Sequence, residues 1–193
     1  MVTIRKYQEK DKDNVRKICA DTCKKFLQKN EKMRRAGTMM FVDYYLDFEP
    51  ENVFVAANEN DEAVGYIVAS TNKDLIREKM KKVYLPQIRR IRWYLGIFTR
   101  FMISTSYKMD TKFGAGFHIN IDEKYQGQKL GPKLLTEMGK HLLNCGFKYM
   151  YLVTQNRKTR GYGFYMHFGF KEAAKCAAGS LCLTYDLEQL RDK

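Results

Sequence analysis

Residues 117–135 read FHINIDEKYQGQKLGPKLL, and this stretch decides the fold. Residues 116–121 are expected to form a strand. Residues 127–144 are expected to form an amphipathic helix that Cys145 and Gly146 close. Gly127 and Gly131 lie where the strand gives way to the helix. The stretch therefore predicts a strand, a glycine-containing turn and a helix in direct succession.

This turn has the chemistry of an anion-binding site. The first N–H groups of a helix have no acceptor within the helix, and the positive end of its dipole lies there. Glycines let a phosphate approach the main chain closely. The two glycines are not followed by Lys-Ser or Lys-Thr, which excludes a P-loop, and the absence of GxGxxG argues against a dinucleotide site. Two interpretations stay open: a phosphate cradle, or glycines that only shape the turn.

The remaining elements alternate only in part between strands and helices. Strands are expected at 3–8, 52–57, 63–70, 116–121, 149–154, 170–176 and 181–187. Helices are expected from Asp11 or Asp13 to 28, and at 38–48, 127–144 and 162–168. A mixed sheet with helices on both faces fits this order better than a parallel sheet. A length of 193 residues suits one domain, 1–193, with an insertion at 72–112.

Two motifs in this order resemble the signatures of the GNAT family of N-acetyltransferases. Gln126-Gly127-Gln128-Lys129-Leu130-Gly131 resembles the family pattern Gln/Arg-x-x-Gly-x-Gly/Ala. Residues 164–170, FYMHFGF, resemble its second pattern, Phe-Tyr-x-x-x-Gly-Phe. The order of elements extends the resemblance over nearly the whole chain. It implies the acyl-CoA N-acyltransferase fold, an α/β (α+β) fold with a mixed, splayed sheet flanked by helices, here with a helical insertion between strands 3 and 4.

The resemblance also implies acetyl-CoA as a co-substrate and no metal. In the family, the first motif binds the pyrophosphate, and the strand before it pairs with the pantetheine arm. The implied cofactor-binding residues are Ile119, Asn120, Ile121, Gln126, Gly127, Gln128, Lys129, Leu130 and Gly131. Lys129 departs from the pattern, because the family usually has glycine there. Asn156 is a further candidate contact, although it lies further upstream of the second motif than the family asparagine does.

The chemistry that the resemblance implies is a direct attack of an amine on the thioester. Tyr165 matches the family tyrosine that faces the sulfur, so it is the expected acid for the departing thiolate. The thioester oxygen gains charge during the reaction and needs a donor. A main-chain N–H group of residues 119–121 is expected to supply it.

The base that takes the proton of the amine is less well defined by the sequence. His118 is the first candidate, because it begins the cofactor strand and an imidazole titrates near neutral pH. Asp110, Asp122 and Glu123 are the alternatives. His141 and His167 lie on predicted helices and are expected to be structural.

These inferences predict an enzyme that moves an acetyl group to a primary amine on a small molecule. A catalytically inactive acyl-CoA sensor or scaffold of the same fold is the first alternative, because Lys129 departs from the family pattern and the base is open. The net charge of +13 favours an acceptor with anionic groups. It also suggests a nucleic-acid-binding module, but no recognition-helix or RNP-type motif supports one, so no nucleic-acid partner is expected.

The N-terminus and the cysteines favour a cytoplasmic protein. Residues 1–7 carry charge where a signal peptide needs apolar residues, and no run approaches the ~18 apolar residues of a membrane span. The five cysteines form no CxxC pair, so reduced thiols are expected. The oligomeric state is open, with a homodimer among the alternatives.

The insertion at 72–112 carries much of the charge. It holds eleven Lys and Arg against three Asp and Glu, so 11 − 3 gives +8 of the total +13. Pro86 is expected to start a helix whose apolar positions recur as far as Met102. Three roles stay open: a helical cover packed on the domain, a lid over the acceptor, or a basic amphipathic helix that lies on a membrane.

Overall fold

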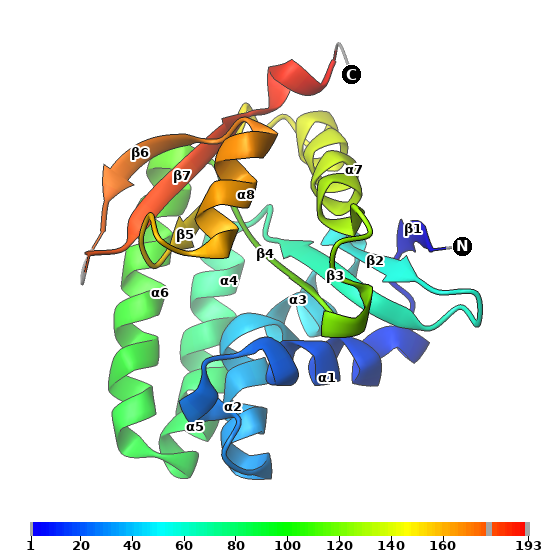
Figure 1. Ribbon diagram of the computed structural model, residues 1–193. Coiled ribbons are helices and arrows are strands. Elements are labelled where there is room, and N and C mark those ends of the chain that lie inside the picture. The colour runs from blue at the N-terminus through cyan, green and yellow to red at the C-terminus, as the bar shows by residue number, and fades with distance from the viewer. Residues whose placement is uncertain (1, 177–178, 192–193) are drawn as a thin grey trace.

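The computed structural model describes residues 2–176 and 179–191, and a seven-stranded sheet runs through it (Figure 1). The strand order is β1-β2-β3-β4-β5-β7-β6. The strands are β1 (Thr3–Lys6), β2 (Val53–Ala57), β3 (Ala63–Ala69), β4 (Ala115–Ile121), β5 (Tyr149–Thr154), β6 (Lys171–Lys175) and β7 (Leu181–Asp186). The β4–β5 pair is parallel and the other neighbours are antiparallel. The mixed sheet expected from the sequence is confirmed.

Helices cover both faces of this sheet (Figure 1). They are α1 (Lys12–Thr22), α2 (Glu31–Phe41), α3 (Asp43–Phe48), α4 (Lys73–Lys79), α5 (Leu85–Ile91), α6 (Trp93–Phe113), α7 (Leu130–Asn144) and α8 (Arg160–Phe168). Successive side chains of β3 point to opposite faces. Tyr66 and Val68 therefore pack with α1, whereas Ile67 and Ala69 pack with α7. The expected layers of helix, mixed sheet and helix are confirmed.

The sheet opens between its two central strands. β4 and β5 pair only at Ala115–Met150 and Gly116–Tyr151. Beyond Gly116, β4 continues beside β3 as far as Ile121, while β5 continues beside β7. The two strands therefore diverge, and the sheet is splayed as the sequence predicted.

The two sequence motifs meet across this opening. Gly131 is the second residue of α7, and Phe164 lies on α8. A Cβ atom at Gly131 would lie 2.9 Å from the Cζ atom of Phe164, closer than side chains tolerate. Glycine at 131 therefore lets α8 pack directly against the start of α7.

The insertion is a helical hairpin, which corrects the prediction of one helix starting at Pro86. Helix α4 continues through a π-helical turn, Met80–Tyr84, into α5. Arg92 adopts an extended conformation and reverses the chain into α6. A Cβ atom at Gly96 would lie 2.1 Å from the Cγ atom of Arg89, so Gly96 allows the two helices to approach closely.

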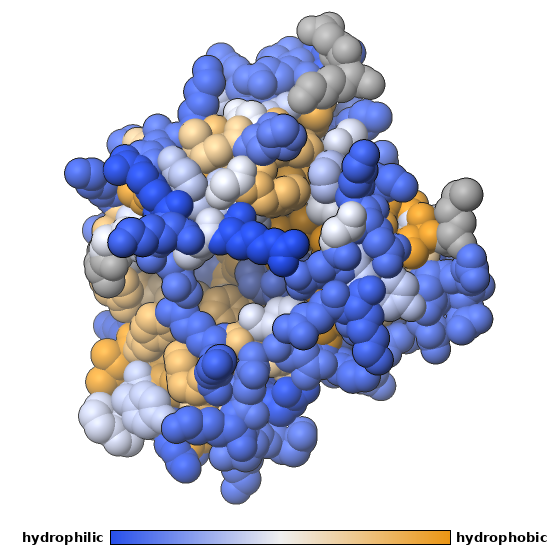
Figure 2. Space-filling model, in the orientation of Figure 1, coloured by the Kyte–Doolittle hydropathy of each residue, from blue (hydrophilic) through white to orange (hydrophobic). Residues whose placement is uncertain are grey.

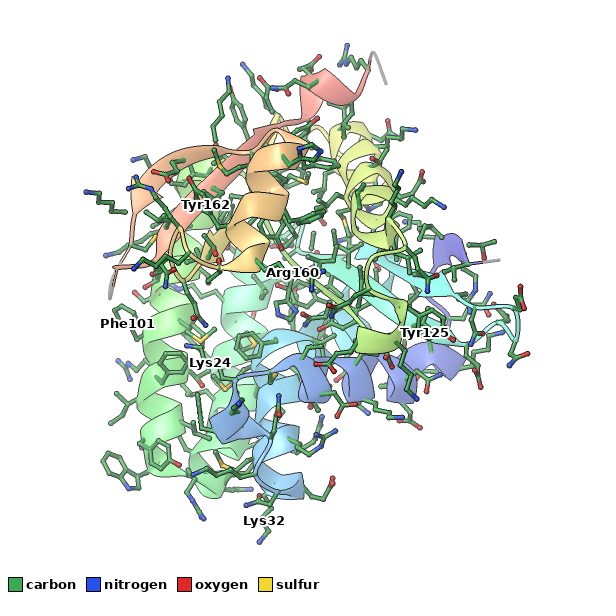
Figure 3. All side chains as sticks on the ribbon, viewed as in Figure 1. Lys24, Lys32, Phe101, Tyr125, Arg160 and Tyr162 are labelled. Atoms are coloured by element: carbon green, nitrogen blue, oxygen red, sulfur yellow. The ribbon has the colours of Figure 1, made fainter. Side chains whose placement is uncertain are left out.

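The hairpin shares a core of its own with α2. This core contains four methionines and the buried aromatic residues Tyr44 and Tyr84. The opposite face of α6 is exposed, with 71% of Trp93 and 52% of Phe101 accessible, and Phe101 projects away from the domain (Figure 3). The inner face of the hairpin is therefore packed against α2, and the role of the insertion stays a matter of prediction.

Two boundaries near the N-terminus differ from the prediction. The first helix ends at Thr22 rather than near 28, because Cys23 is extended. The second begins at Glu31 rather than 38, because the side chain of Asn30 accepts a hydrogen bond from the N–H of Met33 and caps it. A break at Val42 then separates α2 from α3.

Candidate active site

Main-chain groups of β4 point into the opening between β4 and β5. The N–H of Asp122 donates to the carbonyl of Val64 at 2.9 Å. Because residues of an antiparallel ladder alternate in the direction of their main-chain groups, those of His118 and Asn120 face β3. Those of Ile119 and Ile121 therefore face the opening. This geometry favours Ile119 and Ile121 over Asn120 as main-chain contacts for a ligand.

The loop from Gln126 to Gly131 leaves main-chain donors exposed beside this opening. Lys129, the N-cap residue of α7, makes no side-chain cap hydrogen bond, so it leaves the first N–H groups of the helix to other acceptors. Gly127 has a φ of +82° and a Cβ atom there would meet nothing within 4 Å. Lys129 is left-handed too, with a φ of +58°, which explains why glycine suits this position. The side chain of Gln126 donates to the carbonyl of Ile121 at 3.2 Å and ties the loop to β4.

Tyr165 lies on α8, on the face of the sheet that α7 covers. Its ring centroid is 6.2 Å from that of Phe117 on β4 and 5.3 Å from that of Phe170. Burial raises the pKa of the Tyr165 hydroxyl, so it is protonated at neutral pH. Within the described residues, its hydroxyl makes no hydrogen bond, unlike that of Tyr162, which donates to Glu172. The hydroxyl of Tyr165 is therefore free to donate to a ligand.

A cavity of about 220 Å³ opens on the other face of the sheet, between α2, α3, α4, α6 and the ends of β4 and β5. Figure 2 shows a hollow near the middle of this view, with apolar surface inside it and hydrophilic residues around it. Phe117 and His118 from β4 and Leu152 from β5 reach its wall. The cavity therefore meets the β4–β5 opening from the side opposite Tyr165.

Asp110, at the C-terminal end of α6, is the carboxylate in the wall of this cavity. The hydroxyl of Tyr151 donates to it at 2.7 Å, and the N–H of Gly116 is a second donor. Burial nevertheless raises the pKa of Asp110 from 3.8 to about 6. Asp110 is therefore ionised at neutral pH and has a greater proton affinity than an ordinary carboxylate.

His118 is also in the cavity wall, but its environment differs. Its ring stacks on Phe41 with centroids 5.3 Å apart, and its Nδ1 lies 3.1 Å from the hydroxyl of Tyr66. The side chain of Asn120 donates to the same hydroxyl at 2.9 Å. Burial lowers the pKa of His118 from 6.5 to about 4. His118 is therefore neutral at physiological pH and a weak proton acceptor.

The other candidate residues lie outside this cavity. Asn156 uses its side-chain oxygen to accept from the N–H of Lys158, within the turn after β5. Asp122 accepts from the N–H of Lys124 in the turn after β4, and Glu123 is exposed. His141 lies 2.7 Å from the side-chain oxygen of Asn52, on the α7 side of the sheet. Of the four proposed bases, only His118 and Asp110 share the cavity.

Several residues of the cavity lie outside every motif. In the sequence, Tyr151 is only part of a predicted strand, and Arg77 and Tyr107 are only part of the insertion. Their signal was weak because they come from α4, α6 and β5, which are separated in the chain. In the described residues, no three His, Cys, Asp or Glu side chains come together as a metal site. Across the same residues, the helices are all too short or too polar to cross a membrane.

Comparison with known proteins agrees with this geometry. A sequence profile described as the Acetyltransferase (GNAT) family matches residues 20–170. No curated protein sequence is significantly similar to the chain. The profile match spans both motifs, the β4–β5 opening and the whole insertion.

Solved structures share the fold at low sequence identity. SsHAT is 19% identical, with a TM-score of 0.80 over 96% of this chain and 98% of that protein. A GNAT-family acetyltransferase from Staphylococcus aureus Mu50 is 14% identical, with a TM-score of 0.60 over 97% of this chain and 99% of that one. A phosphinothricin acetyltransferase from Sinorhizobium meliloti, solved in complex with AcCoA, is 14% identical, with a TM-score of 0.62 over 96% and 88%.

Proposed function

The chain belongs to the GNAT acetyltransferase family, and from this we propose that it binds acetyl-CoA along the β4–β5 opening and acetylates the primary amine of a small molecule. The observation that carries the proposal is the opening itself. Main-chain groups of Ile119 and Ile121 face it, the N-cap residue of α7 makes no side-chain cap hydrogen bond, and a cavity with the partly buried carboxylate of Asp110 meets it from the other side. The two substrates would thus meet between the strands.

The residues present fit acetyl-CoA. A pyrophosphate needs several N–H donors and room beside them. The first N–H groups of α7 and the open space at Gly127 supply both. Lys129 is exposed and adds a cation to the same loop. Ile119 and Ile121 would pair with the amide groups of the pantetheine arm.

Bound acetyl-CoA supplies a thioester whose carbonyl carbon the amine attacks. The C–N bond forms as the C–S bond breaks. We propose that a main-chain N–H of β4 donates to the carbonyl oxygen, where charge develops. Tyr165 gives its proton to the departing sulfur, and its raised pKa keeps that proton in place until then.

We propose Asp110 as the group that takes the proton from the amine. Its carboxylate attracts an ammonium ion, and its pKa of about 6 is closer to neutrality than that of His118, at about 4. His118 as the base stays a prediction, and its burial argues for a lesser role. The acetylated amine and free CoA leave together with one net proton released.

The test is an assay of acetyl-CoA with a panel of primary amines, measuring CoA thiol release and the mass of the acetylated product. Tyr165→Phe should lower kcat by about 10², with CoA affinity retained. Tyr162→Phe is the matched control, because Tyr162 is on the same helix but bonded to Glu172 towards β6 (Figure 3). It should keep the wild-type rate.

Two results would contradict the proposal in different ways. If CoA raises the melting temperature but no amine is acetylated, the chain is a CoA sensor or scaffold. If CoA gives no stabilisation at all, the assignment of the opening as its binding site is wrong.

A further inference from the structure

Two cations in the insertion reach the wall of the cavity. Lys73 and Arg77 lie one turn apart on α4 and both reach the cavity wall. In the described part of the chain, neither makes an ion pair. Lys73 is partly buried and Arg77 is exposed, whereas two other partly buried cations are paired: Arg5 lies 2.7 Å from Asp11, and Arg16 lies 2.8 Å from Asp43. The cations of the cavity are therefore available to an anionic ligand.

Contacts along α6 bring these cations close to Asp110. The Cζ atom of Arg77 lies 4.2 Å from the ring centroid of Tyr107, one helical turn before Asp110. The Nζ atom of Lys73 lies 3.3 Å from the hydroxyl oxygen of Thr111, the residue after Asp110. Both cations of α4 therefore lie beside the C-terminal turns of α6, where Asp110 is located.

The rest of the cavity is apolar and adaptable. Met39 and Met40 from α2, Met80 after α4 and Met102 from α6 line it, together with Phe41. Methionine side chains adjust to irregular apolar groups. The volume of about 220 Å³ lies below the ~300–1,000 Å³ of drug-sized sites, so a compact ligand suits it.

We infer that the acceptor is a compact amino acid: a primary amine with a carboxylate a few bonds away and an apolar side group. This rests on the proposed function, because the amine would lie at Asp110. The carboxylate would lie at Arg77 and Lys73, and the apolar group among the methionines. Arg77 stacks on Tyr107 and keeps its N–H groups for a carboxylate. A polyamine would place a second cation beside Arg77 and is disfavoured.

The test compares L-phenylalanine with phenethylamine, which differ only in the carboxylate. Binding of each to the CoA-bound protein is measured by calorimetry, and acetylation is measured separately. The wild type should bind L-phenylalanine at least about tenfold more tightly, equivalent to 1.4 kcal/mol. Arg77→Gln should remove this preference, raise KM for L-phenylalanine about tenfold and leave KM for phenethylamine unchanged.

Arg90→Gln is the matched control, since Arg90 is an exposed cation of the same insertion that does not line the cavity. It should retain the preference for the carboxylate. Arg77 is a cleaner target than Lys73, because Lys73 also lowers the pKa of Asp110.

The outcomes separate this inference from the proposed function. Selective, Arg77-dependent binding without acetylation would keep the inference and remove the catalytic proposal. Acetylation of both amines with equal kcat/KM would keep the catalytic proposal and overturn the inference. Binding of neither probe, or the same loss in Arg77→Gln and Arg90→Gln, would also overturn it.

Discussion

On the α7 side of the β4–β5 opening, the contacts that we propose for CoA are main-chain atoms of residues close together in the sequence, joined by the side chain of Tyr165 from α8. On the other side, the cavity is lined by side chains from α2, α4, α6 and β5, which are far apart in the sequence. The first side follows from a local pattern of strand, turn and helix. The second follows from how an inserted hairpin packs on the domain. The difference teaches that a proposed co-substrate site can be predicted from a motif, whereas a proposed acceptor site depends on long-range packing.

The largest expected effect tests the acceptor side. Asp110→Asn should lower kcat/KM by about 10²–10⁴, because the amide cannot accept the proton. His118→Gln should cost less, since His118 is already neutral and hydrogen-bonded to Tyr66. Initial rates with a saturating acceptor and acetyl-CoA measure both effects. Both variants should keep the CoA affinity of the wild type, because neither touches the α7 side.

If kcat/KM fell further in His118→Gln than in Asp110→Asn, His118 rather than Asp110 would be the base. If either variant lost affinity for CoA, the cavity and the α7 side of the opening would not act independently. Melting temperatures measured in parallel control for misfolding.

The same two residues should oppose each other in the pH dependence of stability. The native pKa of Asp110 is raised from 3.8 to about 6, so its stabilising contribution is present below pH 3.8 and is lost as pH rises through 6. The pKa of His118 is lowered from 6.5 to about 4, so its contribution is present above pH 6.5 and is lost as pH falls through 4. Each residue changes the free energy of unfolding by about 3 kcal/mol. Because the two contributions change in opposite directions with pH, they largely cancel in the wild type.

Replacing one of the two residues should reveal how the other changes the free energy of unfolding with pH. Relative to wild type, the free energy of unfolding of Asp110→Asn should fall by about 3 kcal/mol between pH 6.5 and pH 4. His118→Gln should change by a similar amount in the opposite direction. Denaturant titrations across this range measure both slopes. If the wild type and both variants showed the same dependence of the free energy of unfolding on pH, neither group would have the shifted pKa described above.

A smaller effect is expected on the α7 side of the opening, where we propose that CoA binds. Gly127→Asp puts a carboxylate where the pyrophosphate would bind, and should weaken CoA binding about 10–100-fold, or about 1.4–2.8 kcal/mol. Gly146→Asp is matched, because Gly146 also has positive φ, +86° against +82°, and open space around a Cβ atom. Both carry the same backbone strain, but Gly146 closes the far end of α7. Calorimetric titration with CoA should show weaker binding for Gly127→Asp than for Gly146→Asp. Equal losses of CoA affinity in the two variants would contradict the proposed pyrophosphate site.

The fold around the cofactor side could be predicted from the sequence because its signals are local. The strand at 149–154 has the predicted boundaries, and β4, α7 and α8 lie within three residues of theirs. The hairpin could not be predicted in the same way. Arg92, where the chain reverses, is neither glycine nor proline, and the close approach of Gly96 to Arg89 is a tertiary contact.

The same limit applies to the site. The residues that follow from the motifs, Tyr165 and 126–131, lie together at the opening. Asp110 is one of four candidate bases, and we propose it over His118 because burial raises its pKa against the opposing hydrogen bond from Tyr151; neither effect is visible in the sequence. Arg77 lies in neither motif, so the sequence does not mark it as a site residue. Side-chain pKa values and unpaired cations depend on packing, so they required the structure.

An effect of similar size is expected at the contact that joins the two motifs. Gly131→Ala should cost about 1–3 kcal/mol, because the new Cβ atom would lie 2.9 Å from the ring of Phe164. Gly163→Ala on α8 meets nothing within 4 Å and should instead stabilise the protein by about 0.5–1 kcal/mol. Equilibrium denaturation measures both. Gly131→Ala should also lower kcat, since it displaces α8 and Tyr165, while binding of L-phenylalanine stays unchanged. If binding of the acceptor changed as well, the two sides of the opening would be coupled through β4 rather than independent.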